Sequence, residues 1–401
     1  MCPGTSQEGD KQALMEWLDD ALEYISGRIA RRGELHGDGR RPLTFGDLKA
    51  KSVHFAAMTT CLSDGAPYSL PFRNKRFAFR RDALGRVLPK HVVKAMVDSG
   101  EPLSEGIWSL PAEEDTPVLF AVRLSLSFPL LFSAVPLVTR DFTRKDEPER
   151  QQPRDAWFSD GGLCANLPIH FFDALIPTRP TIALTLEPKL HRAERFVVGG
   201  ANLHGVALRP MDTPGHFASA LLDVMQEWRD ELQCQLPGYR DRVTRIRLDK
   251  GEGGLNLDMR EDQMEALMSI GHKAGEAVAT QFDWEGHRWT RYLAAMDQVS
   301  RLLGTLEARE QDIGHLLSTA SEMSTRKRSK RWVDIARVST TELIELSKKW
   351  GLADNNQSVR FRFENRAPRP LASLRPSPSP MDVADAEPGA GLDPIEQDST
   401  E

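Results

Sequence analysis

Apolar residues recur at helical spacing in six stretches of the chain, and each stretch predicts an amphipathic helix. These stretches are Lys11 to Ile29, His91 to Val97, Pro214 to Leu236, Asp262 to Ala279, Arg288 to Leu306 and Val333 to Trp350. In the first, apolar positions from Leu14 to Ile25 define a face that we expect to pack on a core. Asp19, Asp20 and Glu23 define the other face. Anionic lipid would repel that acidic face, which disfavours a lipid-surface helix.

Runs of β-branched and aromatic residues predict the first strands. Lys51 to Leu62 and Pro67 to Phe72 flank Ser63-Asp64-Gly65, which is a turn sequence, so we predict a hairpin. A half-exposed strand is predicted around Phe77 and Phe79.

Two later stretches complete the predicted strands. Arg179 to Leu186 is rich in β-formers and follows a proline, which is typical of an inner strand. Arg242 to Leu248 alternates apolar residues with arginines, which is typical of an edge strand.

One long apolar run, Val118 to Val138, precedes a charged surface loop and the sequence WFSDGGLCANLP. The run predicts a buried strand ending near Val122 and a helical turn from Ser125 to Pro129. It is long enough to cross a membrane, but Arg123 would be costly in lipid, so we predict a core segment. After the loop, Asp160 precedes two glycines, which allow a tight turn that fixes its carboxylate.

Composition narrows the classes of function. The 401 residues are 40% hydrophobic and 27% charged, as in soluble globular proteins, and the net charge of −6 disfavours a nucleic-acid partner. The four cysteines form no CxxC pair and the histidines form no HExxH motif, so neither a metal nor another cofactor is expected. The first residues lack the features of a signal peptide, and we expect a cytoplasmic protein, with attachment to a membrane surface left open.

The residues AVRLSLSFPLLFSAVP followed by WFSDGGLCANLP resemble the patatin-like phospholipases. Two further segments, PLTFGDL at Pro42 to Leu48 and HRWTRYLAAM at His287 to Met296, resemble bacterial members, so the resemblance runs from about Ala13 to Arg301. DGG alone suits an ordinary turn, but DGG behind this serine- and proline-containing run is specific. The resemblance implies a three-layer α/β/α fold and a lipid acyl hydrolase. Its Ser–Asp dyad transfers the serine proton directly to the carboxylate.

The resemblance also implies roles for individual residues. Asp160 is the general base of the dyad, and Gly161 and Gly162 complete its DGG motif. Asn166 shapes the turn and borders the substrate cleft. For Arg123, two roles are open: it pairs with an acid or it faces the substrate cleft. From the residues alone, Asp160 is equally well explained as the cap of a turn or helix. Asp64 is an alternative acid, because Asp-Gly is common in turns.

The chain departs from the family at the nucleophile, because neither GxSxG nor GxGxxG occurs in it. Ser125, Ser127 and Ser159 lie near Asp160 in sequence but outside any nucleophile elbow, so we predict turn or cap roles for them. In the family both missing motifs precede the segment that begins this chain. We therefore expect the C-terminal portion of a patatin-like domain over 1–310, a helical extension over 311–365, and a disordered Pro-, Ser- and acid-rich tail over 366–401.

Three functions remain open. The chain is the Asp-bearing part of a lipid acyl hydrolase that is inactive alone, or a subunit of a split hydrolase whose upstream partner supplies the nucleophile, or a non-enzymatic lipid-binding or scaffold protein. A sheet that lacks its first strands exposes an edge and an apolar face, so we expect self-association. The basic run from Thr325 to Arg331 is a solvated helix end or a surface for anionic head groups.

Overall fold

A computed structural model gives the fold. It describes residues 2–5, 13–33, 40–73, 75–129, 131–139, 153–189, 194–199, 212–214, 216–217, 220, 234, 236, 238–249, 251–253, 256, 258–319 and 330–352. Several predicted segments lie wholly or mostly outside these residues, namely the charged loop over 140–152, the helix over 214–236, the basic run over 325–331 and the tail over 366–401.

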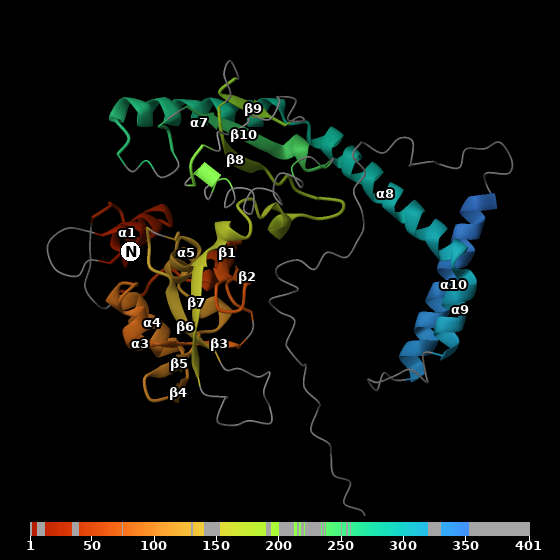
Figure 1. Ribbon diagram of the computed structural model, residues 1–401, viewed down its shortest axis with the longest axis horizontal. Helices are drawn as coiled ribbons and strands as arrows, with labels where there is room; N and C mark the ends of the chain where they lie inside the picture. Colours follow the sequence, from red (N-terminus) through yellow and green to blue (C-terminus); the bar gives the residue numbers. More distant parts are fainter. Residues whose placement is uncertain are drawn as a thin grey trace, which may run out of the picture. The chain divides into compact units, whose positions relative to one another are not determined.

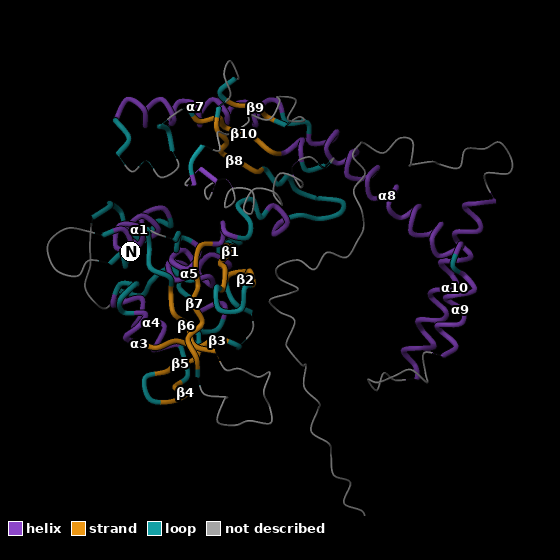
Figure 2. Tube along the Cα trace, viewed as in Figure 1, coloured by secondary structure: helices purple, strands orange, loops and turns teal. Residues whose placement is uncertain are grey.

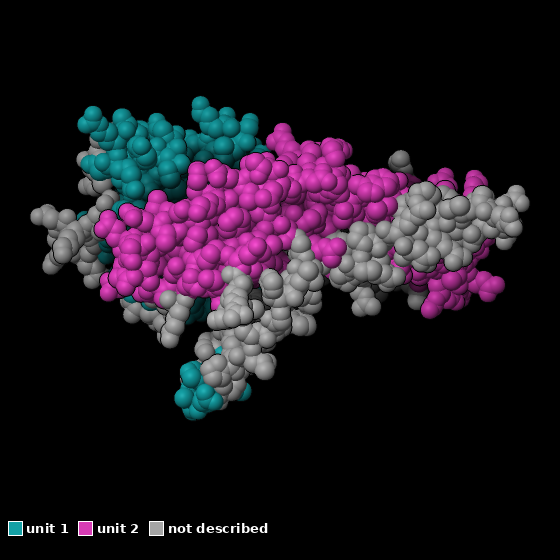
Figure 3. Space-filling view, turned by 90° about the horizontal axis from the view of Figure 1, so that it is seen from above, with its two compact units in different colours: residues 1–168, 211–229, 376–401 teal, residues 169–210, 230–375 magenta. Residues whose placement is uncertain are grey.

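The chain divides into two compact units (Figure 3). Unit 1 comprises Met1–Pro168, Met211–Arg229 and Pro376–Glu401, and unit 2 comprises Ile169–Pro210 and Asp230–Arg375. Helices and β-sheets both contribute, so the α/β class is confirmed at this level. The domain limits predicted at 310 and 365 stay predictions.

Unit 1 is built on a seven-stranded sheet in the order β2-β1-β7-β6-β3-β5-β4 (Figure 1). Each of its recorded strand pairings is antiparallel. The strands are β1 (Ala57–Cys61), β2 (Ala66–Leu70), β3 (Phe77–Arg80), β4 (Pro102–Ser104), β5 (Ile107–Ser109), β6 (Val135–Thr139) and β7 (Arg154–Asp160). The predicted hairpin is confirmed as β1 and β2, and Gly65 in its turn has a φ of 68°, which glycine adopts without strain.

Short helices accompany this sheet. They are α1 (Leu14–Ile25), α2 (Phe45–Ala50), α3 (Arg81–Leu84), α4 (Lys90–Ser99) and α5 (Val118–Ser125), with 3-10 turns at η1 (Glu113–Asp115) and η3 (Gly161–Leu163). One core joins both kinds of element. At its centre the rings of Tyr68, Phe72, Phe77 and Phe158 meet edge to face or tilted, with centroids 5.0 to 6.1 Å apart. Contacts of this kind add to the stabilisation from burial.

The predicted strand ending near Val122 is wrong, because these residues form helix α5. Five of its eight residues are buried apolar side chains of the core, and the helix packs on β1 and β7. A run that is buried nearly all round has no polar face, so its periodicity cannot separate a helix from a buried strand. Within the described residues, no helix is long and apolar enough to cross a membrane.

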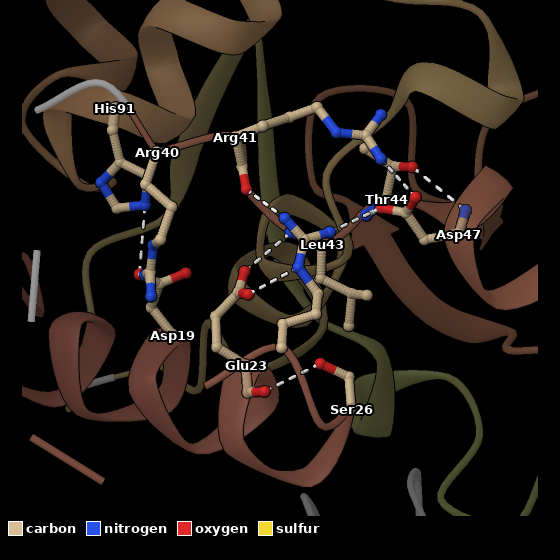
Figure 4. Close-up of polar contacts among 10 residues, drawn as sticks. Asp19, Glu23, Ser26, Arg40, Arg41, Leu43, Thr44, Asp47 and His91 are labelled. Carbon is tan, nitrogen blue, oxygen red and sulfur yellow. Dashed lines mark hydrogen bonds and ion pairs between the residues drawn. The ribbon is translucent and has the colours of Figure 1, made fainter. Parts of the chain in front are cut away.

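Helix α1 buries its acidic face as well as part of the apolar face that was expected to pack on a core, where Leu18 and Leu22 contact the core. Trp17 and Ile25 are 45% and 80% exposed, whereas Asp19, Asp20 and Glu23 are buried. Arginines pair with all three acids, and Figure 4 shows the contacts of Asp19 and Glu23. The arginines come from the segment that follows the helix, as the ion pairs Asp19–Arg40, Asp20–Arg32 and Glu23–Arg28.

The backbone after α1 is held by the same acids. Glu23 accepts the Leu43 N–H at 3.0 Å, and Asp20 accepts the Gly33 N–H at 3.0 Å. His91 of α4 adds its Nε2 at 3.1 Å from Asp19 (Figure 4). Buried charges are tolerated only when they are paired and hydrogen-bonded. The acidic side of α1 therefore holds the segment that follows the helix against it.

Unit 2 contains a three-stranded sheet in the order β8-β10-β9. Its strands are β8 (Ala183–Pro188), β9 (Phe196–Val198) and β10 (Val243–Leu248), with 3-10 turns at η4 (Ile169–Phe172) and η5 (Arg240–Arg242). The predicted inner strand, β8, lies at an edge, and the predicted edge strand, β10, lies at the centre. The prediction failed because Arg245 and Arg247 of β10 are buried and paired with Glu187, not solvated.

Beyond residue 260, the described residues of unit 2 lie almost entirely in helices (Figure 2). They are α7 (Glu261–Gln281), α8 (Trp284–Ala308), α9 (Glu310–Thr319) and α10 (Lys330–Leu352). The helices predicted over 262–279, 288–306 and 333–350 are confirmed. Helix α7 packs on β9 and β10, and α10 packs on α8, where Ser347 Oγ donates to the Leu303 carbonyl at 2.9 Å.

Candidate functional site

Asp160 is the last residue of β7, a strand with hydrogen-bonded neighbours on both sides. It lies opposite Thr59 of β1, and its backbone N–H donates to the Ser127 carbonyl at 3.1 Å. Both contacts fix the backbone from which the carboxylate projects.

The Asp160 carboxylate is directed back onto the turn that follows it. One oxygen accepts the Gly162 N–H at 2.6 Å, which caps the 3-10 turn Gly161–Leu163. Burial raises the pKa of Asp160, and the Gly162 hydrogen bond only partly opposes this effect. A carboxylate with a raised pKa is better matched to accepting a proton near neutral pH.

A Cβ atom on either glycine of the DGG motif would meet a close neighbour. A Cβ atom on Gly161 would lie 2.2 Å from the Met58 carbonyl oxygen of β1. A Cβ atom on Gly162 would lie 2.4 Å from Asn166 Oδ1 and 2.8 Å from Asp160 Oδ1. The structure therefore brings Asp160, Gly162 and Asn166 together, as expected for one turn.

Arg123 of α5 is buried, and its guanidinium links α5 to the loops around it through hydrogen bonds. Its guanidinium donates to Ser127 Oγ at 2.5 Å and to the Ser133 carbonyl at 2.9 Å, and also reaches the Pro3 carbonyl. The recorded partners are hydroxyl and carbonyl oxygens, with no carboxylate among them. Burial lowers the pKa of Arg123 to about 10. Its predicted position beside a substrate stays a prediction.

The hydroxyls of two serines near Asp160 are already engaged in structural hydrogen bonds. Ser127 Oγ donates to the Arg123 carbonyl at 2.6 Å, and Ser159 Oγ donates to the Ser127 carbonyl at 2.8 Å. Both residues are buried, while Ser125 is half-buried. Among the described contacts, no serine hydroxyl is bonded to the Asp160 carboxylate. Ser127 thus bonds the last turn of α5, as a cap residue does, whereas the prediction is wrong for Ser159, which lies within strand β7.

The alternative acid, Asp64, belongs to a different cluster. Tyr68 Oη donates to its carboxylate at 2.5 Å, and the Arg76 guanidinium lies 3.3 Å from it. Burial, with the nearby Asp64 charge, raises the pKa of Tyr68 well above its usual range. Tyr68 of β2 and Arg76 therefore bind the Asp64 carboxylate.

A polar cluster in unit 2 was not predicted from the sequence. The Asp173 carboxylate lies between two buried guanidiniums, those of Arg242 at 3.0 Å and Arg291 at 3.1 Å. Both guanidiniums also lie over the Tyr239 ring, at 4.6 and 5.1 Å from its centroid. The sequence did not indicate this cluster, because arginines that alternate with apolar residues in a predicted edge strand are expected to face solvent.

Beside this cluster, Asp241 and the buried His287 form a pair, with His287 Nδ1 2.6 Å from the carboxylate. Burial alone would raise the pKa of Asp241, but the hydrogen bond and charge of His287, together with Arg242, lower it. The pair links η5 to α8. Among the described residues, no group of three or more His, Cys, Asp or Glu side chains is arranged to hold a metal ion.

The fold and the site define a protein of mixed helices and sheets whose largest sheet carries a partly buried carboxylate in a glycine turn. The chain is 30% identical to the RpoH suppressor of Rhizobium meliloti (strain 1021) over an alignment of 453 residues, which covers 94% of the chain and 70% of that protein. The chain therefore belongs to the family of this RpoH suppressor. No family model matches it, and no solved structure matches it.

Proposed function

We propose that the chain is the acid-bearing part of a patatin-like lipid acyl hydrolase, with Asp160 as the general base of a Ser–Asp dyad. In this proposal the substrate is a carboxylic ester of a lipid, and the serine comes from a longer form of the protein or from a partner chain. The finer fold assignment, a patatin-like three-layer domain, belongs to the same proposal.

The observation that carries the proposal is the geometry of the DGG turn. Backbone contacts fix Asp160 at the end of an inner strand, its pKa is raised by burial, and a Cβ atom on Gly161 would clash with the backbone of β1. A residue that only caps a turn gains nothing from a raised pKa, whereas a base does. Asn166, whose side chain lies against the same turn, is the second residue that we assign to this site.

The name of the Rhizobium relative states an effect on RpoH and no chemistry, so the proposal rests on the residues of this chain. It includes a cytoplasmic location at or near a membrane surface, where a lipid ester would be met. It also includes self-association, because β2 and β4 each lie at an edge of the described seven-stranded sheet.

Two alternatives use the same observations differently. In a split hydrolase, the partner supplies the GxSxG elbow and this chain supplies Asp160. In a non-enzymatic lipid-binding protein, the turn persists as structure only. Labelling with a fluorophosphonate, which reacts with activated serines, separates these functions.

We expect no labelling of the purified chain alone. Labelling should appear when a segment or partner carrying GxSxG is added, and it should be lost in Asp160→Asn but kept in Asp64→Asn, the matched control. Peptide mapping identifies the labelled serine. Labelling of the chain alone at one of its own serines would contradict the missing nucleophile. Labelling that survives Asp160→Asn in the completed protein would contradict the dyad.

A further inference from the structure

The end of β7, where Asp160 lies, extends beyond the last recorded pair of β7 with β6, which joins Phe158 to Val135. Beyond this pair, one carbonyl group holds the end of the strand. The Ser127 carbonyl accepts the Asp160 N–H at 3.1 Å and the Ser159 hydroxyl at 2.8 Å. The backbone of the candidate base is therefore held by Ser127 as well as by β1.

Arg123 holds Ser127 in turn. Its guanidinium donates to Ser127 Oγ at 2.5 Å, and the same hydroxyl donates to the Arg123 carbonyl at 2.6 Å. The guanidinium also donates to the Ser133 carbonyl at 2.9 Å. Arg123 is 1% exposed and Ser127 is 0% exposed, so these bonds lie in a region of low dielectric, where they are stronger than in water. One buried guanidinium thus binds both Ser127, after α5, and Ser133, before β6.

The link from Arg123 to Asp160 runs through these hydrogen bonds and not through the charge of the arginine. The causes of the shifted Asp160 pKa are burial and the Gly162 hydrogen bond, and no cation is among them. A nearby cation would also act in the opposite direction, because it lowers the pKa of a carboxyl group. Arg123 therefore affects the acid through the backbone that carries it.

We propose that Arg123 is a positioning residue for Asp160, which it holds in place through Ser127. The guanidinium fixes the serine, and the serine carbonyl fixes the backbone from which the carboxylate projects. The inference rests on the proposed function, since it assigns a role toward the same base. It gives Arg123 a role that differs from both sequence-based expectations, which were pairing with an acid and a place in the substrate cleft.

The test measures the pKa of Asp160 in the full chain from the NMR chemical shift of its carboxyl carbon, which is assigned by its loss in Asp160→Asn. We expect Ser127→Ala, which keeps the charge of Arg123, to lower this pKa toward the ordinary value of 3.8. A base that is no longer held in place gains water, and burial is the largest cause of its raised pKa.

Ser26→Ala is the matched control. Ser26 follows α1 as Ser127 follows α5, and its hydroxyl donates to the Glu23 carbonyl at 3.0 Å. Ser26→Ala should leave the pKa of Asp160 unchanged.

Arg123→Met is the second variant. Loss of position should lower the pKa of Asp160, whereas loss of a nearby cation would raise it, so the sign separates positioning from an electrostatic role. Adding Ser127→Ala to Arg123→Met should lower the pKa no further, because the arginine acts through the serine. Circular dichroism checks each fold, and either folded single variant decides the test. An unchanged or raised pKa in that variant would overturn the proposal.

Fluorophosphonate labelling of the completed protein separates this inference from the proposed function. Ser127→Ala should slow labelling at least about tenfold without changing the half-saturating concentration of the probe, because a displaced base still leaves the probe bound. A lowered pKa without any labelling of the completed protein would remove the hydrolase and keep the positioning role. Labelling that requires Asp160 but proceeds at the wild-type rate in Ser127→Ala, with an unchanged pKa, would keep the hydrolase and remove the role of Arg123.

Discussion

At the residue scale, the ionisation of Asp160 costs stability. Its pKa in the folded chain is raised above the ordinary value of 3.8, so the folded chain binds the proton more tightly than the unfolded chain. The free energy of unfolding therefore falls as pH rises from the unfolded pKa through the folded pKa, and it stays reduced at neutral pH. We expect Asp160→Asn to melt at the same or a higher temperature than the wild type at pH 7.

The advantage of Asp160→Asn should disappear as pH falls below the ordinary carboxyl pKa, where both side chains are neutral. Thermal melts from pH 3 to pH 8 measure this difference. A variant that is less stable than the wild type across the whole range would show that the carboxylate serves mainly to hold the turn.

The two glycines of the motif should respond differently to alanine. Gly161→Ala places its methyl group against the backbone of β1, which cannot rotate away, and should cost about 3 kcal/mol. Gly162→Ala meets the side chains of Asp160 and Asn166, which can turn aside, and should cost about 1 kcal/mol. Urea unfolding gives both values.

Gly271→Ala is the matched control for this pair. Gly271 lies inside helix α7 with open space around it, so alanine should stabilise the chain by about 0.5 kcal/mol. Equal losses for Gly161→Ala and Gly162→Ala would argue against the close approach of β1 to the turn.

At the element scale, α1 depends on its buried acids. Glu23 is 1% exposed, lies 2.8 Å from Arg28 Nε and accepts the Leu43 N–H. Glu23→Gln keeps an acceptor but removes the charge opposite Arg28, so we expect a loss of about 2 kcal/mol in urea unfolding. Asp98→Asn, which breaks the exposed Lys94–Asp98 pair, should cost less than about 0.5 kcal/mol. Equal losses would mean that the α1 acids are solvated.

The elements show where sequence reasoning succeeds. Hairpin β1–β2 and helices α7, α8 and α10 follow from turn residues and periodicity, which are local properties. Helix α5 was predicted as a strand because a run buried nearly all round has no period. The arginines of β10 are buried because Glu187, distant in sequence, pairs with them, and the acids of α1 are buried because the segment after the helix folds back to supply arginines.

The same limit applies to the candidate site. The DGG motif indicated Asp160 and its glycines, because turn chemistry is local. The close approach of Gly161 to Met58 and the hydrogen bond from Arg123 to the Ser133 carbonyl could not be predicted from the sequence. Both contacts form only when the strands and loops come together. The Asp173 cluster in unit 2 gave no local signal at all, since three separate elements contribute to it.

At the scale of the whole molecule, each of the two compact units has a sheet of its own. Asp160 lies in unit 1, whereas Asp173 and its two buried arginine partners lie in unit 2. Asp160→Asn therefore tests the candidate site without changing a residue of unit 2.

The inner position of β7 has a consequence for hydrogen exchange. Strand β7 is bonded to β1 on one side and β6 on the other, and the Asp160 amide is bonded to the Ser127 carbonyl. Fraying at a sheet edge cannot release the amides that β7 donates to β1 and β6, so their exchange with deuterium requires opening of the sheet itself. The Asp160 amide exchanges when its bond to the Ser127 carbonyl opens. Comparing the two kinds of amide therefore shows whether the backbone of the candidate acid is held as firmly as the sheet that carries it.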